Sequence, residues 1–150
     1  DRQNNAAWGL YVDGLGHEFS CYPSRLNDSP SDSASKLLSP TALALDPNAE
    51  ELYVAESDIS AGRISVFDLR GIYRRQIPLG GEWMQRPVAL ALHPCMPELW
   101  VATACGYIVR ISTGDGRLHG SILRNTKNLA SDMSSGTMLV CHGSDVEVRL

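Results

Sequence analysis

The sequence predicts an all-β protein of the β-propeller class. A segment of apolar and turn residues recurs after 47 residues, so that residues 40–57 and 87–104 are two copies of one pattern. Each copy holds short apolar runs separated by Gly, Pro, Asp and Asn, which is typical of strands joined by tight turns. A repeat of about this length, built from short strands, is typical of propeller blades.

The first copy of the repeat predicts four strands. The first of them is small and apolar throughout, as an inner strand beside a crowded axis should be. The fourth alternates polar and apolar residues and contains Pro78, which suits an outer edge. We expect these strands over residues 41–45, 52–55, 63–67 and 73–79.

The second copy predicts the same four strands, over residues 88–92, 99–102, 107–112 and 118–123. Residues 8–22 and 128–150 resemble incomplete copies. We therefore treat residues 1–150 as a single propeller domain or a fragment of one. Residues 23–39 are rich in Ser, Asp and Pro and predict an exposed insertion loop.

Composition is ordinary for a globular domain. The chain has 150 residues, of which 43% are hydrophobic and 20% charged. No apolar run reaches the roughly 18 residues that a transmembrane helix needs, so we expect no membrane partner. The first residues are polar and do not resemble a secretory signal, but a processed or trimmed N-terminus would look the same. The sequence leaves the compartment open, with a cytoplasmic location slightly favoured.

The net charge of −4 is unevenly distributed. Residues 1–62 carry three basic and ten acidic residues, a net charge of −7. Residues 63–127 carry nine basic and four acidic residues, a net charge of +5. Such asymmetry fits either a charged partner or a solvated surface whose charges cluster.

The repeat motif resembles the NHL-repeat family of β-propellers. The motif reads Pro-x-Ala-Leu-Ala-Leu-Asp/His-Pro, then Glu-Leu-Tyr/Trp-Val-Ala, then, in the first copy, Arg-Ile-x-Val-Phe-Asp. In that family each repeat forms a four-stranded blade, and about six blades close a ring. The resemblance implies an incomplete ring or a fragment of a larger propeller. A small four-bladed ring and an assembly of copies are the alternatives.

Three functions are compatible with this fold. The first expectation is a non-catalytic protein-interaction scaffold, with a protein partner or self-association and without cofactor, metal or catalytic residues. The alternative is an enzyme, a metal-dependent propeller hydrolase or lyase with its site in the axial channel. The third is RNA binding, which would use a basic face with stacking aromatic residues. The candidate basic residues are Arg70, Arg74, Arg75, Arg86, Arg110, Arg117, Arg124 and Lys127.

The connection before the second inner strand is the candidate partner-contact site. It contains Trp83, Met84 and Arg86, and these residue types are enriched at protein interfaces. Packing of Trp83 between neighbouring blades is the alternative interpretation.

Histidines and cysteines give no metal or nucleophile motif. The repeat aligns His93 with Asp46, each directly after an inner strand, and the other histidines fall at other blade positions. A zinc site would need three or four converging ligands. No Cys-x-x-Cys pair exists, and each cysteine falls in or beside an apolar run, which predicts reduced, buried thiols.

Overall fold

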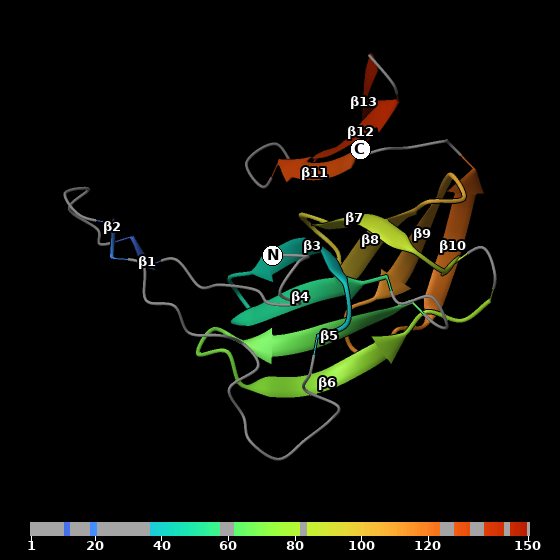
Figure 1. Ribbon diagram of the computed structural model, residues 1–150. Coiled ribbons are helices and arrows are strands. Elements are labelled where there is room, and N and C mark those ends of the chain that lie inside the picture. Colours follow the sequence, from blue (N-terminus) through green and yellow to red (C-terminus); the bar gives the residue numbers. More distant parts are fainter. Residues whose placement is uncertain are drawn as a thin grey trace.

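The computed structural model consists of β-sheets that follow one another along the chain (Figure 1). It describes residues 37–57, 62–81, 84–122, 129 and 130 with their side chains, and the remaining strand residues as backbone. The strands are β1 (Tyr11–Val12), β2 (Phe19–Ser20), β3 (Pro40–Asp46), β4 (Glu51–Glu56), β5 (Arg63–Asp68), β6 (Tyr73–Pro78), β7 (Pro87–Leu92), β8 (Glu98–Thr103), β9 (Tyr107–Ser112), β10 (Leu118–Leu123), β11 (Asn128–Asp132), β12 (Thr137–His142) and β13 (Asp145–Arg149).

Two four-stranded antiparallel sheets form the centre of the described molecule. Strands β3, β4, β5 and β6 pair in sequence order and form what we call the first blade. Strands β7 to β10 do the same and form the second blade. Strands β11 to β13 form a three-stranded sheet, the third blade. The eight strands predicted for the two complete repeats are thus confirmed.

The innermost strands of successive blades lie side by side. Strand β3 contacts β7, and β7 contacts β11, so the inner strands line one common axis. Figure 1 shows the first and second blades facing each other across a shared interior. This is the arrangement in which a propeller places its blades around a central channel.

The core fills the space between the first and second blades. Residues of β4, β5 and β6 pack there against β7, β8 and β9. Gly116 permits a close approach, because it has a φ of +73° and its hydrogen atoms face Ile77 of the first blade. A Cβ atom at this position would lie 2.3 Å from Cγ2 of Ile77.

A cluster of hydrogen-bonded polar side chains is buried at the C-terminal end of β4. Glu56 has no exposed surface, and its carboxylate accepts hydrogen bonds from the hydroxyl of Ser65 and the backbone N–H of Leu38. Arg63 completes the cluster, with Nη2 3.1 Å from Oε2 of Glu56. A buried carboxylate is tolerated only with such partners.

The predicted insertion loop at residues 23–39 is described only at its end. Residues 23–36 lie outside the described residues. We expected Leu37 to be exposed as part of this loop, but it is buried against Val54 and Phe67. The chain therefore enters β3 through a packed residue.

Candidate active site at the ends of the inner strands

Each inner strand ends in a residue that can bind or transfer a proton. Strand β3 is apolar from Ala42 to Leu45 and ends in Asp46, and β7 is followed by His93. The two positions are equivalent in space as well as in sequence, because Asp46 pairs with Glu51 and the backbone N–H of His93 bonds to Glu98. In the third blade, the backbone register gives the same position to Asp132, which pairs with Thr137.

Asp46 and His93 organise equivalent turns in the same way. Oδ1 of Asp46 accepts hydrogen bonds from the backbone N–H groups of Asn48 and Ala49, at 2.9 and 3.0 Å. Nδ1 of His93 accepts from the N–H groups of Cys95 and Met96, at 3.1 and 3.2 Å. An imidazole thus replaces a carboxylate as the cap of a tight turn.

This geometry fixes the tautomer of His93. An imidazole nitrogen that accepts hydrogen bonds carries no proton, so the proton of neutral His93 is on Nε2. The ring lies beside Trp100, with the two ring centroids 6.0 Å apart. His93 therefore faces the side of the second blade that packs against β11.

A cleft of about 230 Å³ lies between the turn after β3 and the turn after β7. Four of the side chains that line this cleft carry chemically active groups. They are the carboxylate of Asp46, the amide of Asn48, the thiol of Cys95 and the hydroxyl of Thr113. Among the described residues, none donates a hydrogen bond to Oδ2 of Asp46. One carboxylate oxygen is thus left to accept a proton or bind a cation.

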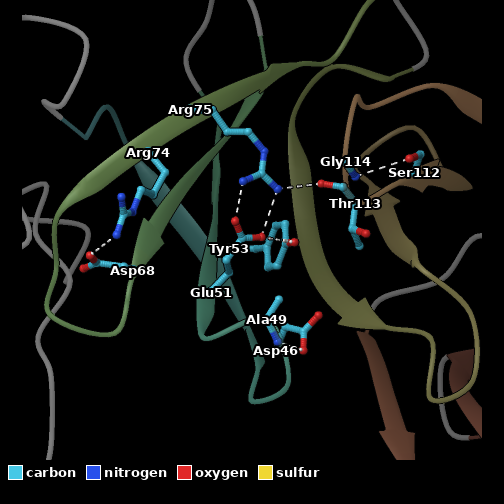
Figure 2. A network of polar contacts seen from close by, with 10 residues as sticks. All are labelled: Asp46, Ala49, Glu51, Tyr53, Asp68, Arg74, Arg75, Ser112, Thr113 and Gly114. Atoms are coloured by element: carbon cyan, nitrogen blue, oxygen red, sulfur yellow. Dashed lines mark hydrogen bonds and ion pairs between the residues drawn. The ribbon is translucent and has the colours of Figure 1, made fainter.

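A charged network supports the wall of the first blade beside this cleft (Figure 2). The guanidinium of Arg75 binds both carboxylate oxygens of Glu51, and the hydroxyl of Tyr53 donates to the same carboxylate at 2.7 Å. The hydrogen bond from Arg75 holds the pKa of Glu51 below its usual range. Burial, together with the bond to Glu51, raises the pKa of Tyr53.

The second blade repeats this network with different residues. Glu98 aligns with Glu51, and it accepts hydrogen bonds from Nε1 of Trp100 at 3.3 Å and Nδ1 of His119 at 2.7 Å. The pKa of Glu98 lies below its usual range. Burial, the largest single influence, acts to raise this pKa, but the hydrogen bonds from His119 and Trp100 and the charge of Arg110 together outweigh burial. Both networks therefore hold an ionised glutamate at the start of the second strand.

The predicted partner-contact residues have different surroundings. Trp83 lies outside the described residues. Met84 is buried in the core between the first and second blades, and Arg86 is exposed with a φ of +58°. Partner contact through Arg86 stays a prediction, whereas the buried Met84 offers little surface for a partner.

Four of the basic residues considered for RNA binding pair with acidic side chains. Arg70 and Arg74 pair with Asp68, at 3.4 and 2.7 Å. Arg75 pairs with Glu51, and Arg110 lies 3.9 Å from Glu98. The described arginines therefore do not form one unpaired basic face.

The cysteine expectation is wrong at two positions. Cys95 and Cys105 are free and exposed, because they lie in turns between strands and not within the strands. The side chains of Cys21 and Cys141 lie outside the described residues. Within the described part of the chain, no group of three His, Cys, Asp or Glu side chains could hold a metal ion. No helix found there is long and apolar enough to cross a membrane.

Comparison with solved structures identifies the fold class. A gluconolactonase of Xanthomonas campestris, described as important in glucose secondary metabolic pathways, matches with a TM-score of 0.60 and 18% identity over 93% of this chain. The hydrazine synthase of Kuenenia stuttgartiensis matches with a TM-score of 0.63 and 18% identity over 98% of this chain. This chain spans 42% and 40% of those two chains. No family model and no curated protein matches the sequence.

These likenesses confirm the β-propeller class and correct the expected function. The gluconolactonase is an enzyme, and this likeness contradicts the expectation of a non-catalytic interaction scaffold. An identity of 18% establishes the fold alone, so the activity of this chain is a matter for proposal.

Proposed function

We propose that this chain is part of a propeller enzyme, a hydrolase or lyase, whose site lies where the inner strands end. The observation that carries the proposal is the change from apolar to acid–base residues at equivalent strand ends, Asp46 and His93, with Asp132 at the same register position. A ring of blades brings such positions around one axis. The gluconolactonase likeness suggests a small cyclic ester as the first substrate class to test.

In this proposal Asp46 is the general base. Its Oδ1 is held by two backbone N–H groups, so the carboxylate has a fixed orientation, and Oδ2 is left to accept a proton from water. Ester hydrolysis needs such a base within hydrogen-bond reach of the attacking water. Asn48 lines the same cleft and can donate hydrogen bonds from its side-chain amide to the substrate, whereas the hydroxyl of Thr113 donates to the backbone carbonyl of Pro97 and can accept one.

The same oxygen atoms suit a divalent cation. Carboxylate and amide oxygens are the ligands that Ca²⁺ and Mg²⁺ prefer. Asp46 and Asn48 supply two of them from one turn, and the remaining donors would come from other blades. Metal dependence is therefore part of the proposal, and it is tested by adding and removing Ca²⁺.

The NHL type of repeat belongs to the same proposal. Its support is the recurring motif that begins at Pro40 and at Pro87. The strand order of the first and second blades is compatible with it.

Lactone hydrolysis by the full chain, measured with gluconolactone in a pH-stat, tests the proposal. Asp46→Asn keeps the oxygen that caps the turn and removes the base, so we expect the rate to fall by about 100-fold or more. Asp115→Asn is the matched control, because Asp115 also caps a turn, by accepting from the N–H of Arg117, but lies outside the cleft. Equal activity of the two variants, or no hydrolysis by the wild-type chain, would contradict the proposal.

Thiol labelling gives a second readout. Cys95 lines the cleft and Cys105 does not, and both are exposed. A bound lactone should slow alkylation of Cys95 and leave that of Cys105 unchanged, as followed by peptide mass mapping. Equal labelling rates with and without lactone would argue against binding in this cleft.

A further inference from the structure

The turn after β7 has only two backbone N–H groups between its ends. It runs from His93 to Glu98 and is closed by a hydrogen bond of 2.8 Å from the N–H of His93 to the carbonyl of Glu98. Two of the four residues between these ends are prolines, which have no N–H group. The other two, Cys95 and Met96, both donate to Nδ1 of His93, at 3.1 and 3.2 Å. The imidazole therefore satisfies every backbone donor inside the turn.

The capped turn also holds a residue of the neighbouring turn. Residues 93–97 and Thr113 line the cleft from the second blade, and we call them the second-blade wall. The carbonyl of Pro97 accepts hydrogen bonds from the backbone N–H and the hydroxyl of Thr113, at 3.0 and 3.2 Å. Arg75 of the first blade binds the carbonyl of Thr113 (Figure 2). The capped turn therefore supplies two of the hydrogen bonds that hold Thr113 at the cleft.

The cap on this turn works only while His93 is neutral. Neutral imidazole has one nitrogen that accepts hydrogen bonds, whereas protonated imidazole carries a hydrogen atom on both nitrogens. Protonation of Nδ1 would leave the N–H groups of Cys95 and Met96 without their acceptor and would place a third N–H group against them. Both groups would then need another partner, which the folded turn does not contain.

The first blade caps its equivalent turn with a different chemical group. Oδ1 of Asp46 accepts hydrogen bonds from the N–H groups of Asn48 and Ala49. A carboxylate oxygen remains an acceptor in mild acid, whereas a protonated imidazole nitrogen does not. The cleft therefore lies between one turn whose cap responds to mild acid and one turn whose cap does not.

Other titratable or charged side chains share the cleft or the turn with His93, or belong to the network around its neighbour Trp100. They are Asp46, Cys95, Glu98, Arg110 and His119. On β11, Asp132 holds the equivalent register position, and its side chain lies outside the described residues. His119 is the other imidazole in this set, so its titration needs a control of its own.

We propose that His93 is a positioning residue whose neutral form holds the second-blade wall, and that protonation at Nδ1 releases this wall in mild acid. The turn then loses its cap, and Thr113 loses its fixed partner in Pro97. The turn that Asp46 caps stays formed, so the cleft loses one of its two sides. The consequence for hydrolysis rests on the function proposed above, whereas the release of the wall does not.

Nuclear magnetic resonance of the full chain, which has a mass of 16.3 kDa, tests this in one titration from about pH 8 to about pH 5. The imidazole nitrogen shifts report the proton on His93, and the amide signals of Cys95, Met96 and Thr113 report the wall. We expect all of them to change with one midpoint. A His93 that stays neutral, amide signals that do not move while it gains its proton, or a Thr113 signal that does not follow the other two would overturn the proposal.

Two variants separate the cap from other effects of acid. His93→Asp gives the second blade the kind of cap that the first blade has, so the amide changes at residues 95, 96 and 113 should disappear from this pH range. His119→Gln removes the other imidazole of the surrounding network and should leave those changes in place. Changes that persist in His93→Asp, or that vanish in His119→Gln, would contradict the proposal.

Hydrolysis of gluconolactone by the same wild-type samples adds a functional readout. The rate should fall with the midpoint of the Thr113 amide signal, by about 10-fold for each pH unit below it. A rate that stays constant through this midpoint would overturn the link between the wall and the reaction. Absence of hydrolysis at every pH would overturn the proposed function alone, because the amide signals decide the release of the wall independently.

Discussion

Arg75, on the outer strand of the first blade, donates a hydrogen bond of 2.7 Å from Nη2 to the backbone carbonyl of Thr113, in a turn of the second blade. The same guanidinium binds Glu51 within its own blade, as Figure 2 shows. One side chain therefore joins the internal network of a blade to the boundary with its neighbour. Together with two hydrogen bonds from Thr113 to the carbonyl of Pro97, this contact holds Thr113 beside the cleft.

Replacing Arg75 should destabilise the fold more than replacing other arginines. Arg75→Ala removes the bond to Thr113 and leaves the carboxylate of Glu51 without its main partner, which should lower the free energy of unfolding by about 1–3 kcal/mol. Arg70→Ala is the control, because the Arg70 side chain is 76% exposed and its pair with Asp68 should contribute no more than about 1 kcal/mol. Urea unfolding measures both, and equal losses would contradict the assigned role of Arg75.

The Glu51 network should make stability depend on pH in the acid range. The hydrogen bond from Arg75 lowers the pKa of Glu51 below its usual value of 4.5 in the folded state. The contribution of ionised Glu51 to the free energy of unfolding is therefore complete above that value, and it is lost as the pH falls through the lower pKa of the folded state. The difference in free energy of unfolding between wild type and Glu51→Gln should be largest near neutral pH and shrink below about pH 4. A difference that stays constant down to about pH 3 would contradict this.

The close approach at Gly116 should not tolerate a side chain. Gly116→Ala places a Cβ atom against Ile77 and forces a non-glycine residue to a φ of +73°. We expect a loss of about 2–4 kcal/mol in the free energy of unfolding. Gly80→Ala is the control, since no heavy atom lies within 4 Å of a Cβ built there. Similar stability of the two variants would show that the two blades can move apart without cost.

The cap at His93 should be replaceable by another acceptor. His93→Asn keeps an acceptor near the N–H groups of Cys95 and Met96, whereas His93→Ala leaves both without a partner. We expect amide exchange at residues 95 and 96 to accelerate strongly in His93→Ala and only weakly in His93→Asn. The alanine variant should also lose about 1–2 kcal/mol of stability. Unchanged exchange in His93→Ala would contradict the assigned tautomer.

The repeat made the fold predictable, because apolar strands and turn residues recur at the same spacing. The repeat alone also aligns His93 with Asp46. That His93 caps its turn as Asp46 does was not predictable, because this cap depends on which imidazole nitrogen accepts the hydrogen bonds from the backbone N–H groups. Neither was the contact from Arg75 to Thr113, which joins residues 38 positions apart across two sheets. The exposure of Cys95 was missed because the residue lies three positions beyond the end of β7, where its apolar neighbours resemble the continuation of a strand.

The buried carboxylate of Glu56 has a consequence for hydrogen–deuterium exchange. Leu38 precedes β3, and its side chain is 36% exposed, so its position alone would suggest rapid solvent exchange. Its amide hydrogen is bonded to Glu56, which is fully buried. Exchange of the Leu38 amide hydrogen will therefore be slow. Its rate will report how often the Glu56 cluster opens, and not how accessible the Leu38 side chain is.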